Sequence, residues 1–217
     1  MRIAITGGNG CIGSWIALKA LEQKHKVTIL DISDDRHRLG WVMTPEQIGQ
    51  LDFCNVNVTV AGELRQALYD KKISHVIHLA GLQTPACRKN PILGEQVNVR
   101  GTMNVFEAVK ELGNQVKCVV YASSAAVYAP AKMYPENNFP LDESVITLPF
   151  THYGAFKVCN ENSARAYWEE SNINSIGLRP WTVLGLGSDL GMTSEPSQAL
   201  CRAAFGVFGI PAGVVHA

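Results

Sequence analysis

A short apolar segment, a glycine-rich turn and a helical segment follow one another at the start of the chain. Residues 2–6 are mostly apolar, residues 7–13 contain the pattern G-x-G-x-x-G, and residues 15–23 have helical spacing. Glycines at such positions let the backbone turn tightly and approach a pyrophosphate, whose charge the helix N-terminus stabilises. The stretch therefore predicts a dinucleotide-binding strand–turn–helix unit. A glycine-rich turn that binds no ligand is the alternative.

The second predicted strand, residues 26–31, ends on a carboxylate, Asp31. At the end of this strand a carboxylate can accept hydrogen bonds from the adenosine ribose of a dinucleotide. The same charge would repel a 2′-phosphate, at a cost of about 1–4 kcal/mol for charges about 4 Å apart. Asp31 therefore favours NAD over NADP, unless it only begins a loop.

Further predicted strands are nearly continuously apolar and alternate with predicted helices. Such strands indicate a parallel sheet that is covered on both faces, so the predicted fold is α/β, doubly wound. The strands are expected at residues 2–6, 26–31, 54–58, 74–81, 117–124 and 174–179. The helices are expected at residues 15–23, 45–51, 61–70, 91–112, 153–170 and 196–205.

Polar and glycine residues lie at the carboxyl ends of these strands, where ligands of parallel sheets gather. These are the Gly7–Gly13 turn, Asp31, Asn57, the Ala80–Gly81 turn and Ser124. His75 and His78 flank the fourth strand, and we expect both to be structural. The common placement predicts one binding site along this edge of the sheet.

Composition restricts the class of protein. The chain has 217 residues, 47% of them hydrophobic, and no net formal charge, which fits one compact domain, or one and part of a second. The chain has no run of Lys and Arg that would predict a nucleic-acid partner. No stretch approaches the ~20 apolar residues of a membrane span. The spacing of the histidines does not predict a metal site. The six cysteines form no C-x-x-C pair, and the N-terminus has no signal pattern, so we expect reduced thiols and a cytoplasmic location.

Tyr153 and Lys157 are four residues apart in a predicted helix. At this spacing both side chains lie on one helix face. A cation beside a tyrosine favours the phenolate, so the pair is a candidate general base near neutral pH. The alternative is an exposed Tyr and Lys that share a face by chance. On the remainder of this helix, the spacing predicts that Ala155, Cys159, Asn162 and Ala166 face the sheet.

Six motifs, in order along the chain, resemble the extended short-chain dehydrogenases/reductases. This is the NAD-dependent epimerase/dehydratase family, which includes UDP-galactose 4-epimerase-like enzymes and nucleotide-sugar dehydratases. The resemblance implies a Rossmann-type sheet with helices on both faces and NAD as cofactor. The motifs are T-G-x-x-G-x-x-G from Thr6, H-L-A-G from His78, N-V-x-G-T from Asn98, S-S-A-A-V-Y from Ser123, Y-x-x-x-K from Tyr153 and L-R-P-x-x-V-L-G from Leu178.

The resemblance implies a role for each catalytic candidate. Ser124 would bond the reacting oxygen, Tyr153 would act as acid and base, and Lys157 would bind the nicotinamide ribose while lowering the pKa of Tyr153. Cofactor contacts are expected from Gly7, Gly10, Cys11, Ile12, Gly13, Asp31, Ile32, Asn57, Val58, Leu79, Ala80, Gly81, Asn98, Ser123, Tyr153, Lys157, Pro180 and Trp181. Substrate contacts are expected from Gln83, Ser124, Ala125, Tyr153 and Thr182.

Two features depart from the family pattern. Dehydratases of the family usually have Thr-Asp-Glu where this chain has Ser124-Ala125-Ala126, so a dehydratase is disfavoured. Family members also continue into a C-terminal lobe that closes over the substrate. We therefore expect a cofactor domain at residues 1–187 and the start of a shortened lobe at 188–217. Either the chain is part of a longer protein or another subunit closes the site.

Together these features predict an NAD-dependent oxidoreductase or epimerase that acts on a hydroxyl group of a sugar or nucleotide sugar. The expected assembly is a homodimer. A dehydrogenase of a non-nucleotide small molecule, such as a uronate, sugar acid or ketone, is one alternative. A non-catalytic dinucleotide-binding redox sensor is another, although such relatives typically lose the Tyr or Lys.

Overall fold

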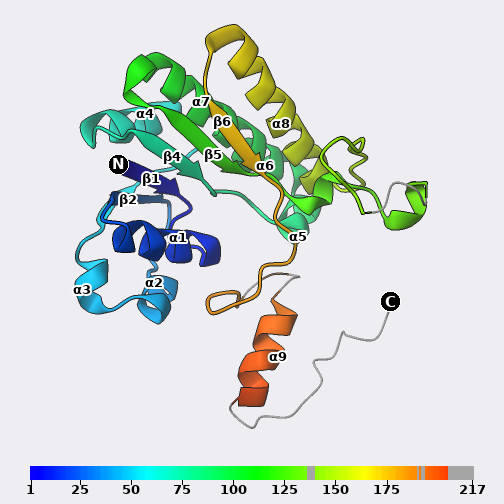
Figure 1. Ribbon diagram of the computed structural model, residues 1–217, viewed down its shortest axis with the longest axis horizontal. Coiled ribbons are helices and arrows are strands. Elements are labelled where there is room, and N and C mark those ends of the chain that lie inside the picture. The colour runs from blue at the N-terminus through cyan, green and yellow to red at the C-terminus, as the bar shows by residue number, and fades with distance from the viewer. Residues whose placement is uncertain (136–139, 190, 192–193, 205–217) are drawn as a thin grey trace.

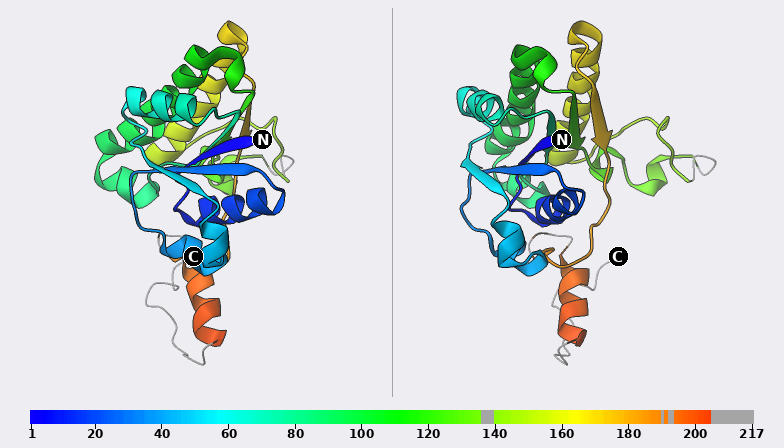
Figure 2. Two further views of the ribbon diagram at one scale, coloured as in Figure 1. Left: turned by 90° about the vertical axis from the view of Figure 1, so that its left-hand side faces the viewer. Right: turned by 60° about the vertical axis from the view of Figure 1, so that its left-hand side comes forward.

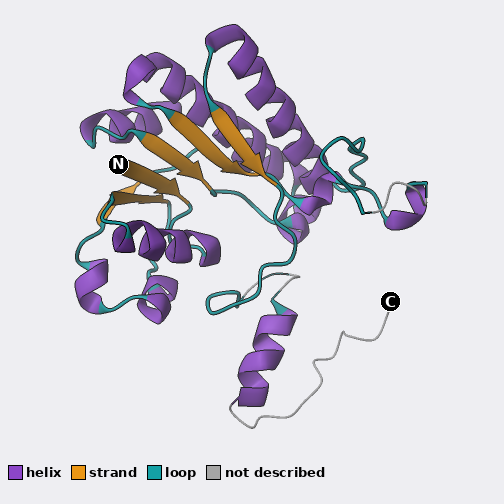
Figure 3. Ribbon diagram, in the orientation of Figure 1, coloured by secondary structure: helices purple, strands orange, loops and turns teal. Residues whose placement is uncertain are grey.

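The structure is a computed structural model that describes residues 1–135, 140–189, 191 and 194–204. Six parallel strands form one sheet in the order β3-β2-β1-β4-β5-β6 (Figures 1 and 3). This is the order of the doubly wound dinucleotide-binding fold, and it confirms the predicted class. The strands are β1 (Arg2–Thr6), β2 (Lys26–Asp31), β3 (Asp52–Asn55), β4 (His75–His78), β5 (Cys118–Ala122) and β6 (Ser175–Leu178).

Helices cover both faces of the sheet (Figure 2). On one face, Leu64, Leu68 and Phe106 pack in a buried cluster with Val119 of β5. On the other, Ala17 and Leu39 pack against Ile5 and Ile29. The helices are α1 (Cys11–Glu22), α2 (His37–Val42), α3 (Pro45–Ile48), α4 (Ala61–Asp70), α5 (Thr84–Lys89), α6 (Pro91–Glu95), α7 (Gly101–Leu112), α8 (His152–Ser171) and α9 (Glu195–Ala204).

The predicted third strand is wrong in its boundaries. It spans Asp52–Asn55 instead of residues 54–58, because the Asn57 side chain accepts hydrogen bonds from the backbone N–H and the hydroxyl of Thr59 at 3.0 and 2.8 Å. This local turn ends the extended backbone before α4 begins. Asn57 still follows the carboxyl end of the strand.

The segment predicted as one helix at residues 91–112 contains three helical pieces. A π-helical turn, Gln96–Arg100, joins α6 to α7 and contains Asn98. Helices α2 and α5 were not predicted, because each has only six residues and therefore too few for a periodic apolar pattern.

The predicted buried face of α8 is also wrong. The side that packs inward contains Gly154, Lys157, Asn160 and Ala164, whereas Ala155 is exposed. Apolar spacing could not identify this face because two of its four residues are polar. None of the helices that the structure describes is both long and apolar enough to cross a membrane.

We expect Gly13→Ala to lower the free energy of unfolding by about 3 kcal/mol or more. A methyl group on Gly13 would lie 2.6 Å from the Gly7 carbonyl oxygen and 2.7 Å from the Gly8 Cα, and backbone atoms cannot rotate away. Urea denaturation monitored by circular dichroism measures the change.

Gly62→Ala is the matched control, because a methyl group on this α4 glycine meets no atom within 4 Å. This variant should gain about 0.5–1 kcal/mol from the lower backbone entropy of the unfolded chain. Equal stabilities for the two variants would contradict the packing argument.

Candidate active site

The predicted site residues converge at the carboxyl edge of the sheet. Thr6 pairs in register with Leu30 and with His78, and His78 pairs with Tyr121. The residues that follow these strands therefore emerge side by side. The glycine turn, Asp31, the Ala80–Gly81 turn and Ser124 are all brought to this edge, as predicted.

The glycine turn packs directly against the neighbouring strand end. Gly7 has φ +67°, and a side chain there would overlap the backbone of Leu79 and Ala80. Helix α1 then begins after Gly10, which provides no side-chain cap. The first-turn N–H groups at Cys11, Ile12 and Gly13 thus have no capping side chain, as expected of a helix start that binds phosphate.

Backbone N–H groups of the glycine turn and of the segment after β2 bind the Asp31 carboxylate. One oxygen accepts the backbone N–H of Asn9 at 3.0 Å, and the other accepts that of Ser33 at 3.1 Å. The Asn9 amide in turn donates to the Ser33 carbonyl at 2.6 Å. Asp31 is half-buried and has further lone pairs for a ribose hydroxyl. The glycine turn at residues 7–13, which we call the glycine cradle, and this carboxylate together fit a dinucleotide.

Ser124, Tyr153 and Lys157 are brought together because α8 begins very close to the turn after β5. A side chain on Gly154 would overlap the Ala126 carbonyl oxygen, so only glycine permits this approach. The hydroxyl of Ser124 accepts the Ala126 N–H at 3.1 Å. The Lys157 ammonium lies 5.5 Å from the Tyr153 ring centroid and donates to the Ala122 carbonyl at 2.7 Å.

Burial shifts the pKa values of Tyr153 and Lys157. Burial raises the pKa of Tyr153 above its ordinary value, although the Ser124 hydroxyl partly offsets the rise. Burial lowers the pKa of Lys157 to about 8. The pKa of the phenol lies above its ordinary value although the Lys157 ammonium is 5.5 Å from the ring centroid, because burial is the largest influence on it. The predicted lowering of the Tyr153 pKa, by a Lys157 that binds the nicotinamide ribose, stays a prediction.

A buried polar chain ties α8 to the strands beneath the glycine turn. Thr102 donates its hydroxyl proton to the Asn98 carbonyl, so it can only accept from Nε2 of His78, 3.0 Å away. Nδ1 of His78 then accepts the Thr6 hydroxyl at 2.7 Å. Asn160, one turn after Lys157, donates to Thr102 and to the Asn98 carbonyl at 3.1 and 2.9 Å.

These contacts fix His78 as the neutral Nε2–H tautomer. Burial, with a smaller contribution from the positive charge of Lys157, lowers the pKa of His78 to about 3. The prediction that His78 is structural agrees with this arrangement. The sequence analysis did not identify the partners, because Thr6, Thr102 and Asn160 are far apart along the chain.

Several predicted cofactor residues have their side chains bonded within the protein. The Asn98 amide exchanges hydrogen bonds with the backbone of Leu82 at 2.9 and 3.0 Å. The Ser123 hydroxyl donates to Glu161 at 2.5 Å. Val58 is buried, and its Cγ2 lies against Gly101. Cofactor contacts by these residues and by Asn57 remain predictions.

The remaining predicted residues surround the same edge. Ile32 and Trp181 are 65% and 73% exposed, so both present apolar surface to solvent. Pro180 accepts the Ala125 N–H at 3.0 Å and so joins the turn after β5 to the segment after β6. Gln83 occupies the N-cap position of α5 without a side-chain capping bond, and its side chain lies against Gly191. Leu79 and Gly81 adjoin the turn after β4, and Thr182 is exposed.

One ion-pair cluster beside the site was missed. Arg179 forms a bidentate pair with Glu161 at 2.8 and 2.7 Å and donates to the Tyr128 hydroxyl at 2.6 Å. Because Glu161 also accepts Ser123, the cluster connects α8, β6 and the residue before Ser124. Ser123 and Tyr128 lie in one motif, Arg179 lies in another, and Glu161 lies outside the six motifs, so no spacing rule connects them.

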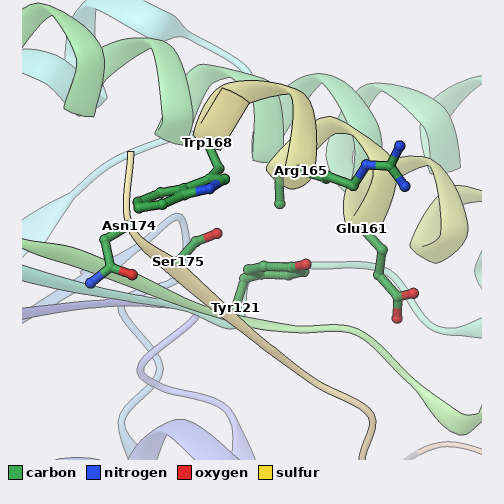
Figure 4. A pocket seen from close by; sticks show the side chains of 7 residues that line it. Tyr121, Glu161, Arg165, Trp168, Asn174 and Ser175 are labelled. Atoms are coloured by element: carbon green, nitrogen blue, oxygen red, sulfur yellow. The ribbon is translucent and has the colours of Figure 1, made fainter. Parts of the chain in front are cut away.

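A hollow of about 390 Å³ lies between α8 and β6, with Tyr121, Glu161, Arg165 and Trp168 around it (Figure 4). Ser124, Tyr153 and Lys157 do not line it, so the arrangement of catalytic candidates does not depend on it. Across the described part of the chain, no three His, Cys, Asp or Glu side chains are grouped to hold a metal ion.

The strand order, the glycine cradle and the carboxylate after β2 define a dinucleotide-binding α/β protein of the Rossmann type. The sequence profile of the NAD dependent epimerase/dehydratase family matches residues 3–206, and the chain belongs to this family. It is therefore an enzyme of an NAD-dependent family, as predicted.

Three known proteins illustrate the similarity. The chain is 32% identical to a UDP-glucose 4-epimerase of Klebsiella pneumoniae over 139 residues, 62% of this chain and 97% of that sequence. It resembles the structure of a UDP-N-acetylglucosamine 4-epimerase from Methanobrevibacter ruminantium M1 in complex with UDP-N-acetylmuramic acid. That match has TM-score 0.69 and 31% identity, over 82% of this chain and 54% of that one.

A monomeric L-threonine 3-dehydrogenase from a metagenome matches with TM-score 0.77 and 26% identity, over 93% of this chain and 61% of that one. The chain spans only 28% and 30% of the length of two curated relatives that it matches over 83% and 94% of its own residues. The activity of the whole protein is therefore a matter for proposal.

We expect Lys157→Met to increase the free energy of unfolding by about 1–3 kcal/mol at pH 7. The pKa of Lys157 is about 8 in the folded protein and 10.5 in the reference state, so the unfolded chain binds more protons between these values. Wild-type stability therefore rises with pH in this window. The advantage of the variant should disappear as the pH rises from 8 to 10.5.

Denaturation at pH 7, 9 and 10.5 measures this difference. The exposed Lys110, changed to Met, is the control and should show no such trend. A variant less stable than wild type at pH 7 would show that burying the ammonium costs less than its bond to Ala122 contributes.

Proposed function

We propose that the chain carries the NAD site and the catalytic residues of an enzyme that epimerises a hydroxyl-bearing carbon of a sugar or nucleotide sugar. The convergence of Ser124, Tyr153 and Lys157 beside the glycine cradle supports this proposal most directly. Bound NAD would supply the hydride acceptor. Similarity to two nucleotide-sugar 4-epimerases supports the substrate class.

In the proposed mechanism, Tyr153 accepts the proton of the substrate hydroxyl as the carbon is oxidised to a ketone, and returns it on reduction. Ser124 donates a hydrogen bond to the same oxygen once its hydroxyl turns toward substrate. Lys157, which donates to the Ala122 carbonyl, would hold a ribose hydroxyl of bound NAD. Its ammonium, 5.5 Å from the Tyr153 ring centroid, would favour the phenolate form of the base.

The proposal includes the division of the chain that the sequence predicts. Residues 1–187 would form the cofactor domain, and 188–217 would begin a lobe that contacts the substrate. In support, α9 extends from the sheet without covering either face (Figure 1). Assembly as a homodimer rests on the family resemblance alone.

A dehydrogenase that releases its ketone is the second candidate, favoured by the similarity to the threonine dehydrogenase. The same three side chains serve both reactions, which differ in whether the ketone is reduced again before it leaves. A redox sensor would need none of them, and the chain keeps all three.

Supplying NAD with a panel of nucleotide sugars, sugars and uronates tests the function. We expect an epimerised nucleotide sugar, detected by chromatography, without net absorbance at the NADH wavelength. Accumulating NADH would favour the dehydrogenase instead. No product from any compound, despite NAD binding, would favour the sensor.

We expect Tyr153→Phe to lower turnover by about 10²–10⁴-fold, because the phenol oxygen that moves the proton is gone. NAD affinity, measured by isothermal titration, should stay within about twofold, since the ring remains. Tyr69→Phe, on the exposed face of α4, is the control and should leave turnover unchanged. Full turnover in Tyr153→Phe would rule out this mechanism.

A further inference from the structure

The chain after β6 passes α1 and reaches α2 on the other side of the site (Figure 2). We call residues Gly185–Asp189 the strap. Gly185 and Gly187 have φ values of +142° and +92°, which only glycine adopts readily, so the strap bends sharply at two points.

The strap rests on the first two turns of α1. The Trp15 indole N–H donates to the Leu186 carbonyl at 2.8 Å. A methyl group on Gly187 would lie 3.7 Å from Cys11 Cα and 3.7 Å from Cys11 Sγ, so the strap backbone is in near contact with the start of the helix. This helix N-terminus follows the glycine cradle and is the predicted binding site for a pyrophosphate.

An ion pair anchors the far end of the strap. Arg38 of α2 donates from Nε and Nη2 to the two oxygens of Asp189, at 2.7 and 3.2 Å. Nε2 of His37 lies 3.5 Å from the same carboxylate. The Arg38 and Asp189 side chains are only 18% and 28% exposed, so water screens the pair less than it would on an open surface.

We propose that the strap is the outer wall of the cofactor site and that the Arg38–Asp189 pair controls how fast NAD(H) leaves. The strap runs from the segment after β6, past the start of α1, to the helix that follows Asp31. A dinucleotide lying along the glycine cradle can dissociate only when the strap lifts, and lifting it breaks the pair. Arg38 and Asp189 are positioning residues that act through the strap.

This inference rests on the proposed function only in placing NAD at the glycine cradle. Its consequence for the reaction is retention of the cofactor. If the reduced cofactor stays bound after the first step, the ketone can be reduced again on the same protein. Retention therefore favours epimerisation over release of an oxidised product.

Stopped-flow displacement tests the proposal. The chain is loaded with NADH, mixed with excess NAD, and the loss of bound-NADH fluorescence gives the release rate. We expect Arg38→Gln and Asp189→Asn each to accelerate release about fivefold, the factor expected for one such ion pair. The reversed pair, Arg38→Asp with Asp189→Arg, should return the rate to within about twofold of wild type.

Arg65→Gln is the matched control, because Arg65 pairs with Glu111 between α4 and α7 and should leave release unchanged. Unchanged release in both single variants would overturn the proposal while leaving the cofactor site intact. Acceleration without recovery in the reversed pair would also overturn it, since disturbed packing of α2 would then be the cause. No NADH binding by the wild-type chain would instead overturn the cofactor site itself.

Discussion

Close backbone packing at the starts of α1 and α8 is the constraint on which the site depends. Gly13 lets α1 begin against the Gly7 and Gly8 backbone, and Gly154 lets α8 begin against the Ala126 carbonyl. The first approach leaves a helix N-terminus open for phosphate. The second brings Tyr153 and Lys157 to the turn that carries Ser124. Because these contacts are between backbone atoms, no rotamer change could accommodate a larger residue.

The buried polar chain through His78 holds these two regions in register. It runs from Thr6, just before the glycine turn, through His78 and Thr102 to Asn160, one turn beyond Lys157. Each hydrogen bond in this chain of side chains has a defined donor and acceptor, with His78 neutral. Asn160 Oδ1 is buried and has no partner among the described residues, but the Asn160 amide N–H groups bond Thr102 and the Asn98 carbonyl. These two bonds define one position of α8 against the sheet. The cofactor turn and the catalytic helix are thereby coupled.

The buried ammonium of Lys157, a candidate catalytic group, lowers the stability of the folded chain near neutral pH. A buried ammonium at Lys157 is held by one carbonyl, and burial alone lowers its pKa to about 8. Replacing such a residue with an apolar one commonly stabilises a fold, at the expense of activity.

The sequence alone determined the sheet class, the cofactor family and the identity of the catalytic candidates. Nearly continuous apolar strands, the Gly7–Gly13 turn and Asp31 are local signals, and local signals can be read along the chain. The boundary of β3 and the helices α2 and α5 were missed because side-chain turns and six-residue segments leave little periodic trace.

Only the tertiary structure decided what surrounds these residues. The inward face of α8 is polar, so apolar spacing pointed to the wrong side. The Arg179–Glu161 cluster, the His78 chain and the Arg38–Asp189 pair each join residues from distant segments. The pKa shifts of Tyr153 and Lys157 likewise follow mainly from burial, which a helical spacing of four cannot reveal. Such contacts exist only once the sheet has brought the strand ends together.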